Sequence, residues 1–91
     1  MKYRFIGWCK EGAHDKVWVA IDLGDSKVLT CWGRRGRKLQ TKLNIDNWEL
    51  RKLITSKEYK YKEIQECQLD NVYPDFETDL EKTAIWATLK F

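Results

Sequence analysis

Five positively charged side chains and no acidic one fall within the nine residues 34–42, which makes this segment the strongest candidate for chemistry in the sequence. Its arginines present planar forks of N–H donors that match phosphate oxygens. Trp32, just before the segment, offers a flat face on which a sugar or a base can stack. The net charge of the chain is +3, so the residues outside the segment sum to −2 and the basicity is local. Such local basicity indicates a surface for a polyanion.

The residues that we expect to bind nucleic acid are cationic or hydrogen-bonding side chains of this segment and the aromatic ring before it. They are Trp32, Arg34, Arg35, Arg37, Lys38, Gln40 and Lys42. Gly33 and Gly36 are expected to form the turn that holds them, because glycine lets a backbone approach a phosphate closely. A second interpretation stays open, in which Trp32 caps the core and the arginines are only solvated at a hairpin turn.

Other reactive residue types form no catalytic or metal-binding pattern in the sequence. His14 stands in a polar stretch with no nucleophile nearby, so we expect a solvated residue. Cys9, Cys31 and Cys67 are widely spaced without a Cys-x-x-Cys motif, which predicts reduced, mostly buried thiols. Cys31 would be reactive only if the neighbouring arginines lower its pKa. We therefore expect no catalytic residue, no metal, no cofactor and no enzymatic activity.

Four strands in the first half of the chain are expected to position the basic segment. Alternation of apolar and polar residues at period two predicts them at Lys2–Cys9, Lys16–Leu23, Ser26–Trp32 and Arg37–Leu43. The second strand places its β-branched residues on one face, which predicts that it is half-buried. A polar loop at 10–15 and turns at 24–25 and 33–36 are expected to join the strands.

A helix is expected to follow the fourth strand. Asp46 as N-cap with Glu49 three residues later is the pattern of a capping box, so the helix should start there. Its apolar stripe suggests an end near Ser56 or Lys57. Residues 60–67 fit a strand only loosely.

The last third of the chain is expected to be a short extension. We expect a loop at 71–74, a short acidic helix at 75–82 and a closing strand at 84–91. Tryptophans that fall in strand or helix patterns are expected to pack in the core. They are Trp8, Trp18, Trp48 and Trp86.

Length and composition predict one folded domain over residues 1–91, large enough for a single core. Hydrophobic residues make up 43% and charged residues 34% of the chain, which is typical of a globular protein. The longest wholly apolar run, 17–21, is too short to cross a bilayer, and the first residues lack a secretion signal. We therefore expect a cytoplasmic protein that does not enter membranes.

The order of the motifs resembles the WGR domain family, a small module named for its Trp-Gly-Arg tripeptide. Lys16-Val17-Trp18 is followed by Trp32-Gly33-Arg34, with Gly36 and Gln40 in register behind it. The resemblance covers roughly residues 2–60, and the extension covers about 68–91. The chain departs from the family pattern at Leu39, where the family usually has glycine.

The resemblance implies an α+β fold, a small twisted antiparallel β-sheet with one helix packed on one side, here followed by a short C-terminal helix and strand. In the poly(ADP-ribose) polymerases that detect DNA breaks, this module binds near a DNA terminus. Its tryptophan packs on a sugar and its arginine reaches the backbone. These two roles carry over to Trp32 and Arg34.

The function that we expect is non-enzymatic binding of the DNA backbone, including duplex ends. The alternative is a protein-interaction adaptor or small inhibitor whose basic strand meets an acidic protein partner. The sequence leaves open whether the nucleic acid is DNA or RNA, whether ends or internal sites are bound, and what the oligomeric state is.

Overall fold

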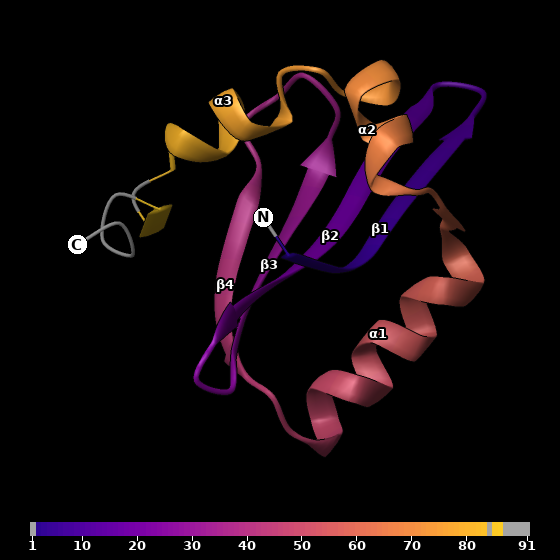
Figure 1. The fold of residues 1–91 in the computed structure, drawn as a ribbon. Helices are drawn as coiled ribbons and strands as arrows, with labels where there is room; N and C mark the ends of the chain where they lie inside the picture. Colours follow the sequence, from indigo (N-terminus) through magenta and orange to yellow (C-terminus); the bar gives the residue numbers. More distant parts are fainter. Residues whose placement is uncertain (1, 84, 87–91) are drawn as a thin grey trace.

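Four long antiparallel strands joined by short connections form most of a five-stranded sheet, as the alternating sequence predicts (Figure 1). The computed structural model describes residues 2–83, 85 and 86. The strands are β1 (Lys2–Glu11), β2 (His14–Gly24), β3 (Lys27–Arg34), β4 (Gln40–Ile45) and the short β5 (Lys62–Glu63). Their order across the sheet is β4-β3-β2-β1-β5, so the described part of the sheet ends at β4 on one side.

Two connections differ from the sequence prediction. β1 and β2 are joined by a tight turn at Gly12 and Ala13 rather than by a polar loop over 10–15, and Gly12 adopts the positive φ of +58° that such a turn requires. β4 begins at Gln40 and not at Arg37, because the chain first turns at residues 35–37 and buries Leu39 before it pairs with β3.

In the part of the chain that the structure describes, three helices with defined bounds complete the α+β fold: α1 (Trp48–Lys60), α2 (Glu66–Val72) and α3 (Phe76–Glu81). The N-cap of α1 is Asn47 rather than the predicted Asp46, because the Asn47 side chain accepts a hydrogen bond from the Leu50 N–H at 2.9 Å. Asp46 instead pairs with two arginines. The helix continues to Lys60, beyond the predicted end.

α3 falls within the predicted acidic helix 75–82, whereas α2 replaces part of the predicted loop 71–74 and part of the ambiguous stretch before it. Ile85 and Trp86, which were expected in a closing strand, are helical. The other residues of that predicted strand, 84 and 87–91, lie outside the described residues. Within the described part of the chain, no helix is long and apolar enough to span a membrane.

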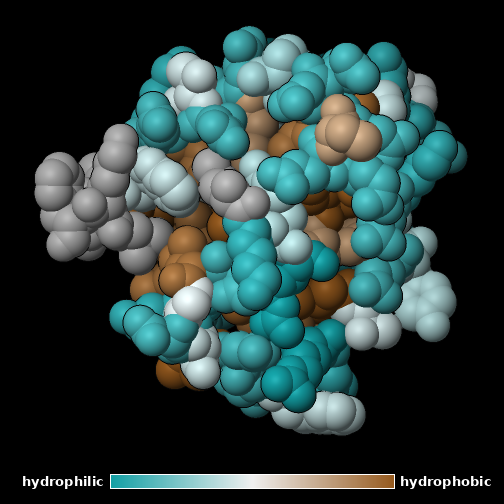
Figure 2. Space-filling view, viewed as in Figure 1, coloured by the Kyte–Doolittle hydropathy of each residue, from teal (hydrophilic) through white to brown (hydrophobic). Residues whose placement is uncertain are grey.

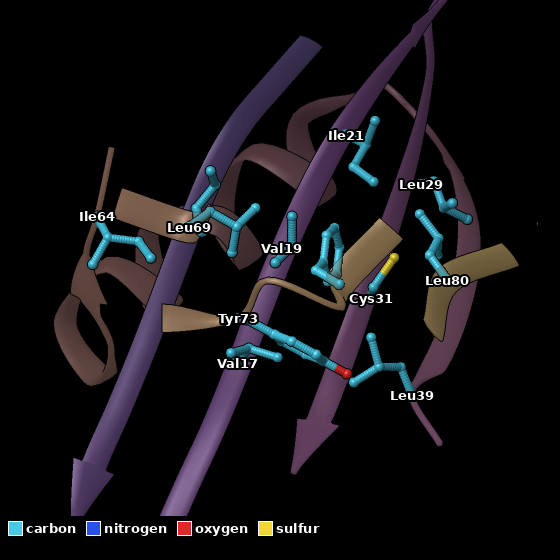
Figure 3. Close-up of a cluster of buried hydrophobic side chains, with 12 residues drawn as sticks. Val17, Val19, Ile21, Leu29, Cys31, Leu39, Ile64, Leu69, Tyr73 and Leu80 are labelled. Atoms are coloured by element: carbon cyan, nitrogen blue, oxygen red, sulfur yellow. The ribbon is translucent and has the colours of Figure 1, made fainter. Parts of the chain in front are cut away.

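α2 and α3 cover one face of the sheet and enclose the larger core cluster. Figure 3 shows strand residues such as Val19 and Cys31 facing Leu69, Tyr73 and Leu80 from the helical layer. The sequence predicted one helix on the sheet and a short C-terminal helix, which α3 confirms, but it did not predict that α2 and α3 together form a layer on this face.

α1 covers part of the opposite face, where a second cluster is formed by Phe5, Trp18, Ala20, Val28 and Leu50. β2 is consequently buried on both faces and not half-buried as predicted, with Val17, Trp18, Val19 and Ala20 each at most 3% exposed. Figure 2 shows the face of the molecule seen in Figure 1 as mainly hydrophilic, with apolar residues visible in openings between polar ones.

Candidate nucleic-acid interface

The register of the sheet places Trp32 at the centre of a group of polar and cationic side chains. Trp32 of β3 lies opposite Trp18 of β2 and opposite Gln40 of β4. Residues directly opposite each other in an antiparallel pair share one face of the sheet, and residues two apart on a strand share it too. Arg34 is therefore on the face of Trp32 at one end, and Lys42 is on the same face at the other end.

Lys16 joins this group, although the basic segment of the sequence does not contain it. It lies opposite Arg34 in the β2–β3 pairing and is exposed. The sequence indicated the place of Lys16 beside Arg34 only indirectly, through the turn at 24–25 that sets the register of the hairpin. We name the surface formed by Lys16, Trp32, Arg34, Gln40 and Lys42 the Trp32 patch.

The Trp32 indole is held in place without being fully buried. It packs against the cluster of Phe5, Trp18 and Leu50 under α1 and remains partly exposed. α1 makes its main contacts with β1 and β5, which lie at the opposite edge of the sheet from β4 (Figure 1). Lys57 of α1 places its Nζ 5.9 Å from the centre of the Trp18 ring, so a further cation borders the patch.

The cations of the Trp32 patch are available for an external anion. Lys16, Arg34 and Lys42 are exposed. Within residues 2–83, 85 and 86, none of the three has a carboxylate within 4.0 Å. Three unneutralised positive charges around a fixed aromatic ring create a local positive potential.

Arg35 has a different environment from its neighbour Arg34. Its guanidinium donates to the Asp15 carboxylate through Nε at 2.9 Å and Nη2 at 2.7 Å, and a third N–H donates to the Val72 carbonyl. The same group lies 5.6 Å from the centre of the Trp8 ring. Arg35 therefore ties the β3–β4 connection to β2 and to the end of α2, and its charge is already compensated.

Asp15 is the centre of this arrangement, which we name the Asp15 clamp: Trp8, Asp15, Arg35 and the Val72 carbonyl. The Trp8 indole N–H donates to the Asp15 carboxylate at 2.8 Å. The pKa of Asp15 is lowered, first by this hydrogen bond and then by the Arg35 guanidinium. Both donors stabilise the charged form of the carboxylate.

Arg37 and Lys38 also lie outside the Trp32 patch. They line a hollow of about 350 Å³ together with Gly36, Asp79, Lys82 and Thr83, beside the end of α3. The structure thus divides the predicted site residues into three groups. Trp32, Arg34, Gln40 and Lys42 stay together, Arg35 belongs to the clamp, and Arg37 and Lys38 face α3.

The predicted glycine turn has the expected conformation. Gly33 and Gly36 adopt φ values of +144° and +82°, which strain any residue with a Cβ. Leu39, only 3% exposed, anchors the connection in the larger core. The hydroxyl group of Tyr73, which follows α2, donates a hydrogen bond to the Asp79 carboxylate, and in Figure 3 the Tyr73 ring reaches toward Leu39.

The remaining candidates lie away from the patch or are buried. Burial raises the pKa of the Cys31 thiol to about 12, so the neighbouring arginines do not activate it. Cys9 is partly exposed and Cys67 is exposed, which contradicts the prediction of mostly buried thiols. Trp48 is 72% exposed on α1, so its predicted place in the core is wrong.

Comparisons of this chain with known protein families, with curated proteins and with solved structures find no match. The resemblance to the WGR family therefore stays a prediction, based on the residues around Trp32.

Proposed function

We propose that this chain is a non-enzymatic module that binds the backbone of duplex DNA, including its ends, on the Trp32 patch. The observation that carries the proposal is the exposure of Lys16, Arg34 and Lys42, without ion pairs among the described residues, around a tryptophan whose position is fixed.

The proposed roles follow from the chemistry of the side chains. Arg34 and the two lysines contact phosphates, which position a protein on DNA but carry no sequence information. Trp32 packs its exposed part on a sugar or on the terminal base pair, where stacking tolerates any sequence. Gln40, opposite Trp32, donates or accepts a hydrogen bond at the same place.

Salt dependence gives a quantitative test. With three phosphate contacts, the logarithm of the affinity falls against the logarithm of salt with a slope of about −2.7, or roughly 40-fold between 50 and 200 mM. The double variant Arg34→Ala/Lys42→Ala should keep about one contact, a slope near −0.9 and a loss of only about 3.5-fold over the same range. Fluorescence anisotropy with short labelled duplexes of two unrelated sequences measures both slopes.

The matched control is Lys10→Ala/Lys27→Ala, which removes the same charge from exposed positions outside the patch. The control should keep the slope of the unmodified protein. If the two double variants titrate alike, binding depends on net charge only and the Trp32 patch is not the interface.

The adaptor hypothesis places an acidic protein on the same cations. Pull-down before and after nuclease treatment separates the two proposals. A partner that is released by nuclease supports the DNA proposal, whereas one that is retained without nucleic acid and lost in Arg34→Ala/Lys42→Ala favours the adaptor.

A further inference from the structure

Two aromatic side chains on the outer side of α1 are among the most exposed apolar residues of the described chain. Trp48 is 72% exposed and Tyr59 is 88% exposed. An isolated exposed apolar residue is ordinary, so the case for a binding surface depends on how these two rings are arranged with their neighbours. The Trp32 patch does not include them.

Helical geometry aligns these rings into one stripe. Trp48, Lys52, Thr55 and Tyr59 are spaced by four, three and four residues, so they project from the same side of α1. Leu50 and Ile54, which pack on the sheet, lie on the other side. A hollow of about 460 Å³ runs along the stripe and is lined by Trp48, Arg51, Lys52, Thr55, Ser56 and Tyr59.

The residues between the rings distinguish nucleic acid from protein as the occupant. A helix that docks on a protein carries apolar anchors at successive turns, and interface cores are depleted in lysine and serine. Here the intervening lining residues are two cations and two hydroxyl groups, and none is acidic. Arg51 shares Asp46 with Arg4, while Lys52 has no ion pair within the described residues.

We propose that the Trp48–Tyr59 stripe binds single-stranded DNA, with bases stacked on the two rings and a phosphate at Lys52. Aromatic platforms joined by cations are the usual means by which proteins hold single strands without reading sequence. The rings are eleven residues apart, or about 16 Å along the helix. At the roughly 3.4 Å rise of a stacked strand, the stripe spans about five nucleotides.

The proposed stripe deepens the proposed function, because it specifies the DNA partner as a duplex that carries a single-stranded overhang. α1 and the Trp32 patch belong to the same side of the sheet, since Trp32 packs on the cluster beneath α1. A duplex end on the patch can therefore extend its free strand over α1. The duplex part depends on the proposed function, whereas binding of a free single strand by the stripe does not.

The test compares three labelled probes by anisotropy: a short blunt duplex, the same duplex with an overhang of about six thymidines, and a single strand of thymidines. For the unmodified protein, the overhang should raise affinity at least roughly fivefold over the blunt duplex. Trp48→Ala/Tyr59→Ala should abolish that gain and weaken single-strand binding by about 25-fold or more, because each stacked base contributes about fivefold at the least.

Controls keep the interpretation specific. Trp48→Phe/Tyr59→Phe retains the rings and should retain most of the gain, while Ile45→Ala removes another exposed apolar residue, 68% exposed in β4, and should change nothing. Because the replaced rings are largely exposed, circular dichroism should show unchanged folding for every variant.

The outcomes separate this inference from the proposed function. Binding of the blunt duplex without a gain from the overhang overturns the stripe and leaves the Trp32 patch standing. Binding of the single strand but not of the blunt duplex supports the stripe and overturns duplex binding. The stripe is also overturned if Trp48→Ala/Tyr59→Ala keeps the gain in affinity from the overhang. The same holds if single-stranded RNA binds as tightly as single-stranded DNA and this binding is unchanged in Trp48→Ala/Tyr59→Ala.

Discussion

Arg34 and Arg35 are neighbours in the sequence, yet the structure predicts opposite effects when each is replaced by alanine. Arg34 is exposed on the Trp32 patch, so Arg34→Ala should weaken DNA binding and leave stability nearly unchanged. Arg35 holds the Asp15 clamp, so Arg35→Ala should lower stability. It should not reduce the salt dependence of binding while the protein is folded.

The size of the stability effect follows from the contacts of the guanidinium. Arg35 makes two hydrogen bonds to Asp15 and one to the Val72 carbonyl, and its side chain is 29% exposed against 19% for that of Asp15. One hydrogen bond to a charged group contributes about 1.5–3 kcal/mol, and because solvent screens this partly exposed site we take about 1.5–2 kcal/mol for the three bonds together. The contact with the Trp8 ring adds about 0.5–1 kcal/mol. We expect a loss of about 2–3 kcal/mol, or on the order of 10–20 °C in Tm for a domain of this size.

The assays are thermal unfolding and the salt titration of duplex binding, carried out on both variants. Arg34→Ala should change the free energy of unfolding by at most about 0.5 kcal/mol and reduce the salt slope by about 0.9. Arg35→Lys keeps the charge but loses the planar fork, so it should also be destabilised. If Arg35→Ala melts within about 2 °C of the unmodified protein and lowers the salt slope, Arg35 is a phosphate contact and the clamp is not structural.

Three further predictions concern stability and thiol chemistry. The hydrogen bond from the Trp8 indole N–H is the main cause of the lowered pKa of Asp15. The charged Asp15 therefore stabilises the folded protein fully above its unfolded pKa of about 3.9, and this stabilisation is lost as the pH falls through the lower folded value. Asp15→Asn should make the free energy of unfolding less pH-dependent below about pH 5. Burial raises the pKa of Cys31 to about 12, so a thiol-specific chromogenic reagent should label exposed Cys67 at once and Cys31 only after unfolding. Leu39→Ala should cost about 2–4 kcal/mol in a denaturant titration because Leu39 is only 3% exposed, and a cost under about 1 kcal/mol would contradict its role as an anchor.

Local patterns predicted the elements whose signals are contained within a few residues. Alternation and glycine turns located β1, β2 and β3, and an Asx residue before Trp48 located α1 to within one residue of its N-cap. The burial of β2 on both faces was missed because the β-branched residues on one face predicted a half-buried strand, although Trp18 on the other face was expected in the core. Tertiary packing decides that question, because α1 covers the face of Trp18 and Ala20 while α2 and α3 cover the face of Val17 and Val19.

The site shows the same division between local and long-range information. The sequence predicted Trp32, Arg34, Gln40 and Lys42 as site residues, and strand alternation places these four on one face. The predicted set also included Arg35. Its pairing with Asp15, twenty residues away, is a tertiary contact that the local sequence does not show. A run of cations in a turn can point to either side of a sheet, and composition alone does not distinguish the sides.

The division of charge between the two faces gives the proposed binding a direction. Residues 66–81, which contain α2 and α3, carry six acids and no base. This layer covers the face opposite the Trp32 patch. An approaching polyanion is repelled by the helical layer and attracted by the patch, so the field of the protein orients the encounter before contact. The same acids explain why a net charge of only +3 is compatible with a strongly basic binding surface: the negative charge is concentrated where DNA is not expected to bind.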